Sequence, residues 1–192
     1  MANKGALPEV FVLPGESRLV EEEVILRTVL GSCVGVAFWV PRLGIAGLCH
    51  PMLPVCPAET RARISPAFGR RYVDFAIRDF VGRLDSMGSK RKEVRVKLFG
   101  GADVLPVNKP SSRPTVGRLN AEAALRVLSE EGIEVVASRL GGTSGLQIRF
   151  HTGSGEVMVH RLEGGSERQR ALSKPEGARR RVAGDRVRAG EP

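Results

Sequence analysis

The pattern of apolar and polar positions along the chain predicts short strands near both ends of the sequence and two helices between them. Residues 34–40 are almost entirely apolar, which is typical of a strand buried on both faces. A Pro-Arg-Leu-Gly turn at 41–44 leads into a returning strand at 45–50. Apolar residues recur every three or four positions over 68–87 and again over 117–130, which indicates two amphipathic helices.

The remaining strands are short and separated by turn residues. They are predicted at 9–13, 24–29, 94–99, 133–137, 146–150 and 156–160. Strands that gather at the two ends of a sequence predict an α+β fold rather than regular βαβ winding. Residues 51–66 contain four prolines and are expected to form a loop.

Composition changes sharply beyond residue 162, where Gly, Ser, Glu and Arg replace most apolar residues. We therefore expect one domain over 1–162 and a basic, disordered tail over 163–192. The chain carries a formal net charge of +9, part of it in the tail, which favours an acidic partner. Aromatic residues make up only 5%, so we expect no nucleic-acid partner, although salt-dependent binding through the tail stays an alternative.

The sequence also carries information about location. No apolar run approaches the roughly 20 residues that a helix needs to cross a bilayer, so no membrane insertion is expected. The N-terminus is polar, and the three cysteines are an odd number. We interpret the protein as cytoplasmic, with its thiols reduced.

The candidate chemistry lies at the two sides of the predicted hairpin, where Cys33 follows Gly31 and Ser32, and His50 ends the returning strand. The hairpin folds the chain back, so His50 can lie beside Cys33. A cysteine beside a histidine is the minimum for covalent acyl transfer, because the imidazole takes the thiol proton and the thiolate attacks a carbonyl carbon. Backbone amides around Gly31 and Ser32 could bind the carbonyl oxygen of the substrate.

Other interpretations of these residues stay open. Cys33 can be a buried structural thiol, and His50 can be a ring tied to a backbone group. A zinc site could use Cys33, Cys49, His50 and Cys56. Their spacing does not match the usual zinc pairs, and neighbouring residues on a strand point to opposite faces, so we expect no metal and no cofactor.

Several motifs keep their order and spacing over residues 8–163. They are Leu30-Gly31-Ser32-Cys33-Val34, His50-Pro51-Met52-Leu53-Pro54, Lys97-Leu98-Phe99-Gly100-Gly101-Ala102, Gly117, Asn120, Gly132-Ile133, Gly141-Gly142 and Thr152-Gly153. Together they resemble the chemoreceptor glutamine deamidases of the CheD family. The resemblance implies a layered α/β/β fold, similar to the catalytic core of cytotoxic necrotizing factor toxins.

The resemblance also implies an activity and a set of site residues. The activity is hydrolysis of the side-chain amide of selected glutamines in methyl-accepting chemoreceptors, which gives glutamate and ammonia. By this resemblance Cys33 is the nucleophile, His50 is the general base and Thr28 orients His50, and no cofactor takes part. The same site could also hydrolyse a glutamate methyl ester, because the amide and the ester would form the same acyl-enzyme.

The partners implied by the resemblance are chemoreceptor cytoplasmic domains and a CheC-type phosphatase. Because chemoreceptor signalling helices are rich in glutamate, we predict that a face carrying Arg70, Arg71 and Arg78 contributes to docking. A solvated face without a partner is the alternative for these arginines. The alternative for the whole chain is a non-catalytic adaptor that binds receptors or the phosphatase.

Overall fold

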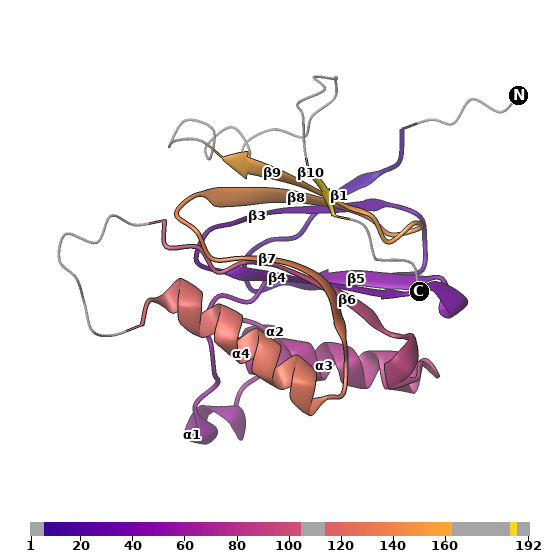
Figure 1. Cartoon of the computed structure of the whole chain (residues 1–192). Helices are drawn as coiled ribbons and strands as arrows, with labels where there is room; N and C mark the ends of the chain where they lie inside the picture. The colour runs from indigo at the N-terminus through magenta and orange to yellow at the C-terminus, as the bar shows by residue number, and fades with distance from the viewer. Residues whose placement is uncertain (1–5, 105–113, 163–184, 188–192) are drawn as a thin grey trace, which may run out of the picture.

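The protein is built in three layers (Figure 1). The structure is a computed structural model that describes residues 6–104, 114–162 and the backbone of 185–187. Helices form one outer layer, a five-stranded sheet lies in the middle, and a second five-stranded sheet forms the other outer layer. This arrangement confirms the α+β class and the α/β/β layering expected from the sequence.

The middle sheet is organised around its most apolar strand. Its strands, in spatial order, are β2 (Ser17–Val20), β5 (Ile45–Cys49), β4 (Val34–Val40), β6 (Arg95–Gly100) and β7 (Val135–Leu140). β4 pairs antiparallel with β5 and β6, and β7 runs parallel to β6. Six of the seven residues of β4 are buried, because both faces of this central strand are covered. The continuous apolar run at 34–40 therefore has the predicted meaning.

The outer sheet brings the beginning and the end of the domain together. Its strands, in spatial order, are β1 (Glu9–Phe11), β3 (Ile25–Leu30), β8 (Gly145–His151), β9 (Val157–Leu162) and β10 (Asp185–Val187). β3 pairs parallel with β1 and antiparallel with β8. Strand β3, which carries Thr28, is therefore held by a strand from the far end of the domain.

Two long helices cover the face of the middle sheet that points away from the outer sheet. They are α3 (Val73–Ser86) and α4 (Val116–Glu130). Both predicted helices exist, but the first begins at Val73 instead of residue 68, because the chain leaves helical geometry at Tyr72, so Arg70 and Arg71 precede the helix. The predicted loop at 51–66 contains the four-residue helix α1 (Ala58–Arg61), and helix α2 (Pro66–Gly69) follows at its end. Turns of 3-10 helix lie at Pro41–Leu43 and Arg91–Glu93.

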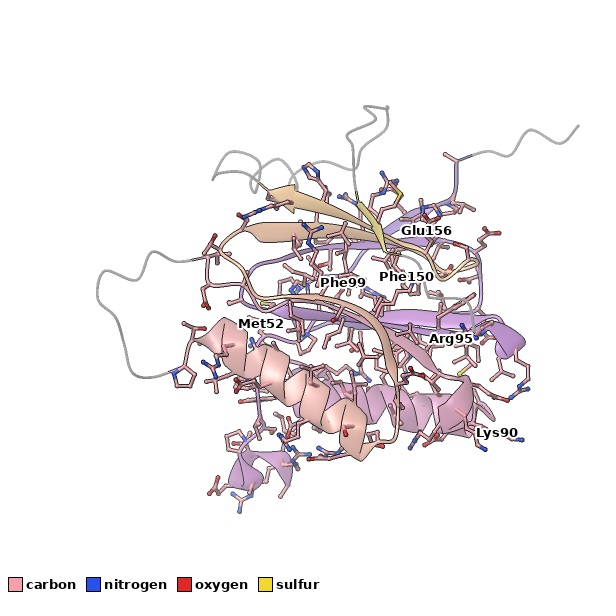
Figure 2. All side chains as sticks on the ribbon, in the orientation of Figure 1. Met52, Lys90, Arg95, Phe99, Phe150 and Glu156 are labelled. Carbon is pink, nitrogen blue, oxygen red and sulfur yellow. The ribbon has the colours of Figure 1, made fainter. Side chains whose placement is uncertain are left out.

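The three layers enclose two apolar cores, one on each side of the middle sheet. On the helix side, the ring of Phe38 stacks on that of Phe80 with centroids 4.4 Å apart. Between the sheets lie Phe99 and Phe150, as Figure 2 shows. Each such fully buried side chain stabilises the fold by roughly 1.5–3 kcal/mol. The core between the sheets is also the one that the candidate site borders.

Some expectations fall outside what the structure describes. Residues 163–192 lie outside the described residues except for β10, which pairs with β9, so the division into domain and tail stays a prediction. Across the described residues, no helix is long and apolar enough to span a membrane.

Candidate active site

The pairing of β4 with β5 brings Cys33 and His50 to the same face of the middle sheet. Cys33 lies in the turn between β3 and β4, and His50 follows β5 directly. The antiparallel pairing continues past the strand end, because Val34 N–H donates to the carbonyl oxygen of Pro51 at 3.3 Å. This register sets His50 opposite Gly35, so Cys33 and His50 are diagonal neighbours. Both side chains face the outer sheet.

Thr28 reaches His50 from the outer sheet. Its hydroxyl oxygen lies 2.8 Å from His50 Nδ1 and 2.7 Å from the carbonyl oxygen of Val12. The carbonyl oxygen can only accept, so the single hydroxyl proton of Thr28 is donated to Val12. Thr28 must then accept from His50, which assigns the proton of the ring to Nδ1. The other ring nitrogen, Nε2, is left as a free base.

The environment of His50 keeps the ring neutral. Its side chain is buried, and burial lowers the pKa of His50 from 6.5 to about 4, while the contact with the carbonyl of Val12 acts weakly in the opposite direction. Within the described residues, Nε2 is buried without a hydrogen-bond partner. A neutral ring with an unoccupied Nε2 can accept a proton at neutral pH.

The three cysteines lie in different environments. Cys33 is half-buried beside the core between the sheets, and burial raises the pKa of its thiol, although its own backbone N–H lowers it in part. Cys49 points to the helix side, where burial raises its pKa to about 12. Cys56 is buried in the segment after the site. The described residues contain no group of three or more His, Cys, Asp or Glu side chains that could hold a metal ion.

The turn that carries Cys33 has its carbonyl oxygens fixed from outside. The carbonyl of Gly31 accepts from Ala102 N–H at 2.9 Å, and the carbonyl of Cys33 accepts from Gly101 N–H at 2.8 Å. Among the backbone hydrogen bonds of the described residues, none uses the N–H of Ser32 or Cys33. These two amides are therefore the candidates to bind a substrate oxygen, and substrate binding by the Gly31 and Ser32 turn stays a prediction.

Glycines allow the backbone around this turn to pack closely. Gly100 has a φ of +97°, and a Cβ there would lie 2.3 Å from the carbonyl oxygen of Cys33. A Cβ on Gly117 in α4 would lie 2.6 Å from the carbonyl oxygen of Gly101. Larger residues at either position would push these segments apart. The first turns of α4 are thus in direct contact with the segment that binds the Cys33 turn.

Asn120, in α4, connects the two halves of the site. Its side chain is completely buried, and Nδ2 donates to the carbonyl oxygens of Ser32 at 2.8 Å and Met52 at 2.9 Å. Met52 lies between the middle sheet and the start of α4 (Figure 2). From the sequence, Asn120 could be placed in a motif but given no role. Its two hydrogen-bond partners are separated from it by 88 and 68 positions along the chain, and local patterns do not reveal such contacts.

Comparisons with known proteins agree on one family. A family model described as CheD chemotactic sensory transduction matches residues 52–161. A Geobacter sulfurreducens protein named probable chemoreceptor glutamine deamidase CheD 2 is 38% identical over 156 residues, which cover 81% of this chain and 91% of that protein. The chain belongs to the CheD family. The resemblance seen in the sequence is thereby confirmed.

More distant members support the same assignment. A CheD protein of Maridesulfovibrio salexigens is 35% identical over 164 residues, which cover 84% of this chain and 96% of that protein. The crystal structure of YlmD from Geobacillus stearothermophilus aligns with a TM-score of 0.41 and 16% identity over 65% of this chain and 50% of that one, a likeness too weak to add to the argument. The matched span of the CheD family model includes Asn120 but begins after His50.

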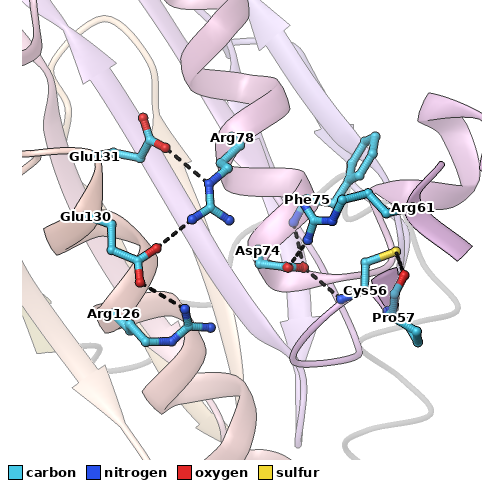
Figure 3. Close-up of polar contacts among 9 residues, drawn as sticks. All are labelled: Cys56, Pro57, Arg61, Asp74, Phe75, Arg78, Arg126, Glu130 and Glu131. Atoms are coloured by element: carbon cyan, nitrogen blue, oxygen red, sulfur yellow. Dashed lines mark hydrogen bonds and ion pairs between the residues drawn. The ribbon is translucent and has the colours of Figure 1, made fainter. Parts of the chain in front are cut away.

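In this CheD-family chain, a buried carboxylate holds the segment that leaves the site (Figure 3). Asp74, at the start of α3, accepts from the backbone N–H of Cys56 at 2.9 Å and of Phe75 at 2.8 Å, and it also pairs with Arg61. The Asp74 side chain is 4% exposed. Because it is the common partner of three groups, Asp74 ties the proline-rich segment to the helix layer.

Two of the three arginines predicted from the CheD resemblance to dock a substrate form ion pairs with carboxylates of this chain. Arg70 pairs with Asp79 at 2.9 Å. Arg78 pairs with the two glutamates that end α4, at 2.5 Å and 3.3 Å, as Figure 3 shows. Arg71 is different, because it is exposed and its guanidinium lies 4.6 Å from the ring centre of exposed Phe68.

Arg71 also lies next to the site in space. Its carbonyl oxygen accepts from the N–H groups of Met52 and Leu53, at 2.8 Å and 2.9 Å. Its side chain packs against Gly15, whose N–H donates to the carbonyl oxygen of His50 at 2.7 Å. Arg71 is therefore the member of the predicted arginine face that borders the residues after His50.

Proposed function

We propose that this chain is a protein-glutamine deamidase that hydrolyses the side-chain amide of selected glutamines in methyl-accepting chemoreceptors. Cys33 is the nucleophile, His50 the general base and Thr28 the residue that orients His50. The observation that carries the proposal is the Thr28 contact, which assigns the proton to Nδ1 and leaves Nε2 as a base on the Cys33 side of the sheet. The names of the CheD relatives support the substrate class.

The first half of the reaction forms a thioester. The raised thiol pKa of Cys33 and the lowered pKa of His50 keep the resting pair neutral. As the substrate amide binds, the thiol proton moves to Nε2 and the sulfur bonds to the amide carbon. The carbonyl oxygen becomes an oxyanion, which the N–H groups of Ser32 and Cys33 stabilise. The C–N bond then breaks, and Nε2 returns the proton to the nitrogen, which leaves as ammonia.

The second half releases glutamate. A water molecule gives a proton to Nε2 and its oxygen bonds to the thioester carbon. The C–S bond breaks, and the sulfur of Cys33 takes the proton back from Nε2. Every proton transferred and every atom that forms a bond in these two steps comes from the chain, the substrate or water, so the proposed reaction needs no cofactor. A glutamate methyl ester passes through the same thioester with methanol as the leaving group.

The substrate is expected to approach over Arg71. Chemoreceptor signalling helices are rich in glutamate, and an exposed cation beside the site attracts an acidic helix. We expect Arg71→Glu to raise KM at low salt and leave kcat within about threefold, since the charge lies outside the reacting groups. Lys92→Glu makes the same charge change at an exposed position in the 3-10 turn Arg91–Glu93. Equal KM values for the two variants would remove Arg71 from the docking surface.

The proposal extends to the cellular location of the reaction and to the partner proteins. The substrate glutamines lie in the cytoplasmic domains of chemoreceptors, so the reaction takes place in the cytoplasm. The resemblance to the CheD family also supports a CheC-type phosphatase as a second partner. The competing function is a non-catalytic adaptor that binds the same proteins without turnover.

The experiment that tests the proposal measures ammonia release from a chemoreceptor fragment of the same organism. Mass spectrometry locates the gain of one dalton at each converted glutamine, and methanol release from a methylated fragment tests the ester reaction. We expect Cys33→Ala and His50→Ala to abolish turnover while they stay folded. Cys56→Ala, the control, removes a buried thiol outside the site and should retain wild-type turnover. Binding of the fragment without turnover by the wild type would favour the adaptor.

A further inference from the structure

One peptide group connects Asn120 to the chemistry. The carbonyl oxygen that Asn120 binds at 2.8 Å belongs to Ser32, and the same peptide group carries the N–H of Cys33. In a trans peptide the C=O and the N–H bonds lie in one plane and point in opposite directions. A hydrogen bond that fixes the carbonyl therefore fixes the direction of the Cys33 N–H as well.

The fixed N–H points away from the helix layer. Asn120 lies in α4, on the helix side of the middle sheet, so the N–H opposite the Ser32 carbonyl points to the side of the sheet on which the Cys33 side chain packs. An oxyanion formed by attack of that sulfur develops within reach of the same N–H. No backbone acceptor within the described residues competes for it.

The second bond of Asn120 holds the other half of the site. Nδ2 donates to Met52 at 2.9 Å, and the N–H on the far side of that peptide group, from Leu53, donates to Arg71. The backbone two residues after His50 is thus held from both sides. Turning the Asn120 amide over would place its oxygen against two carbonyl oxygens, so the orientation of the amide is fixed.

We propose that Asn120 is a positioning residue for glutamine deamidation: its bond to Met52 fixes the amide in place, and its bond to Ser32 aims the Cys33 N–H at the developing oxyanion. The inference rests on the proposed function and adds to it a residue that does not touch the substrate. A buried asparagine that only satisfies two carbonyl groups would affect folding alone. The proposed role affects turnover beyond any change in stability.

The test compares two reactions of the same sulfur in the full chain. Deamidation needs the oxyanion donor, whereas alkylation of Cys33 by iodoacetamide forms no oxyanion. We expect Asn120→Ala and Asn120→Asp to lower kcat for deamidation roughly 10- to 100-fold, less than the loss of a whole oxyanion donor, with KM changed little. The alkylation rate of Cys33 should stay within about threefold of the wild type. Asn120→Asp is close in shape but replaces the donor with an acceptor.

A matched control separates positioning from folding. Thr152 is also buried, and its hydroxyl binds backbone groups of Glu22 and Val24, at the end of β3 away from the Cys33 turn. Thr152→Val should lower stability and leave kcat unchanged. If either Asn120 variant is unfolded at the assay temperature, Asn120→Ser, which keeps one small donor, takes its place.

Each outcome decides between the possibilities. A selective loss of kcat with alkylation retained supports the role of Asn120. Wild-type kcat in the Asn120 variants, or parallel losses of turnover and alkylation, would overturn it while the proposed function stands. A wild type that shows no deamidation would overturn the proposed function and the inference together, and the alkylation rates would show whether Cys33 itself is reactive.

Discussion

The burial of a neutral His50 makes the stability of the fold depend on pH in a predictable way. The folded pKa of about 4 is below the ordinary value of 6.5, so the unfolded chain binds the proton more readily. The stability contributed by this neutral ring is complete above the unfolded pKa and is lost as the pH falls towards the folded one. When the pH falls from about 7 to about 5, protonation of His50 in the unfolded chain should lower the unfolding free energy by about 2 kcal/mol. Below the folded pKa, the total loss relative to pH 7 should reach about 3 kcal/mol.

The assay is urea unfolding at several pH values, for the wild type and for His50→Gln. Other titrating groups are present in both proteins, so the difference between their pH slopes isolates His50. We expect the wild type to lose about 2 kcal/mol more than the variant over this range. The ring carbons of His50 in a nuclear magnetic resonance titration give the same pKa directly if the variant does not fold. Equal slopes together with a His50 pKa near 6.5 would refute the assigned burial and tautomer.

Three further predictions follow from contacts around the site. Thr28→Val removes the acceptor for His50 Nδ1–H, so steady-state kinetics should show kcat lowered about 10- to 100-fold, and Thr28→Ser should restore most of it. Gly100→Ala places a Cβ on the carbonyl oxygen of Cys33 at a positive φ, and urea unfolding should show a loss of about 2 kcal/mol or more. Asp74→Asn weakens the two bonds, to Cys56 and Arg61, that hold the proline-rich segment, so limited trypsin digestion should cut within 57–63 faster than in the wild type.

Local patterns in the sequence were enough to predict most elements of the fold. The run at 34–40 and the turn after it gave β4 and β5 nearly residue by residue, because a buried hairpin needs a distinct pattern of apolar and turn residues. The edge strand β2 was missed, since its four residues, Ser-Arg-Leu-Val, are only partly buried and carry no strong alternation. Division of the strands into two sheets depends on pairings across more than 100 residues, which no local pattern contains.

The candidate site shows the same division between local and distant information. That Cys33 and His50 are neighbours could be predicted because one hairpin joins them, whereas Thr28 became a candidate through the family resemblance alone. The role of Asn120 could not be predicted, because its bonds join α4 to two distant turns. The arginine face was predicted without its partners: Arg70 and Arg71 precede α3, and Glu130 and Glu131, which pair with Arg78, lie at the end of α4.

The bond between Thr28 and His50 joins two sheets, and this has a consequence for protein synthesis. All three proposed catalytic residues lie within the first 50 residues of the chain, yet β3 is held in the outer sheet by β8, which ends at His151. We therefore expect a chain still attached to the ribosome to stay inert until nearly the whole domain has emerged. If the proposed site is correct, glutamines of neighbouring proteins are thereby protected from deamidation during translation.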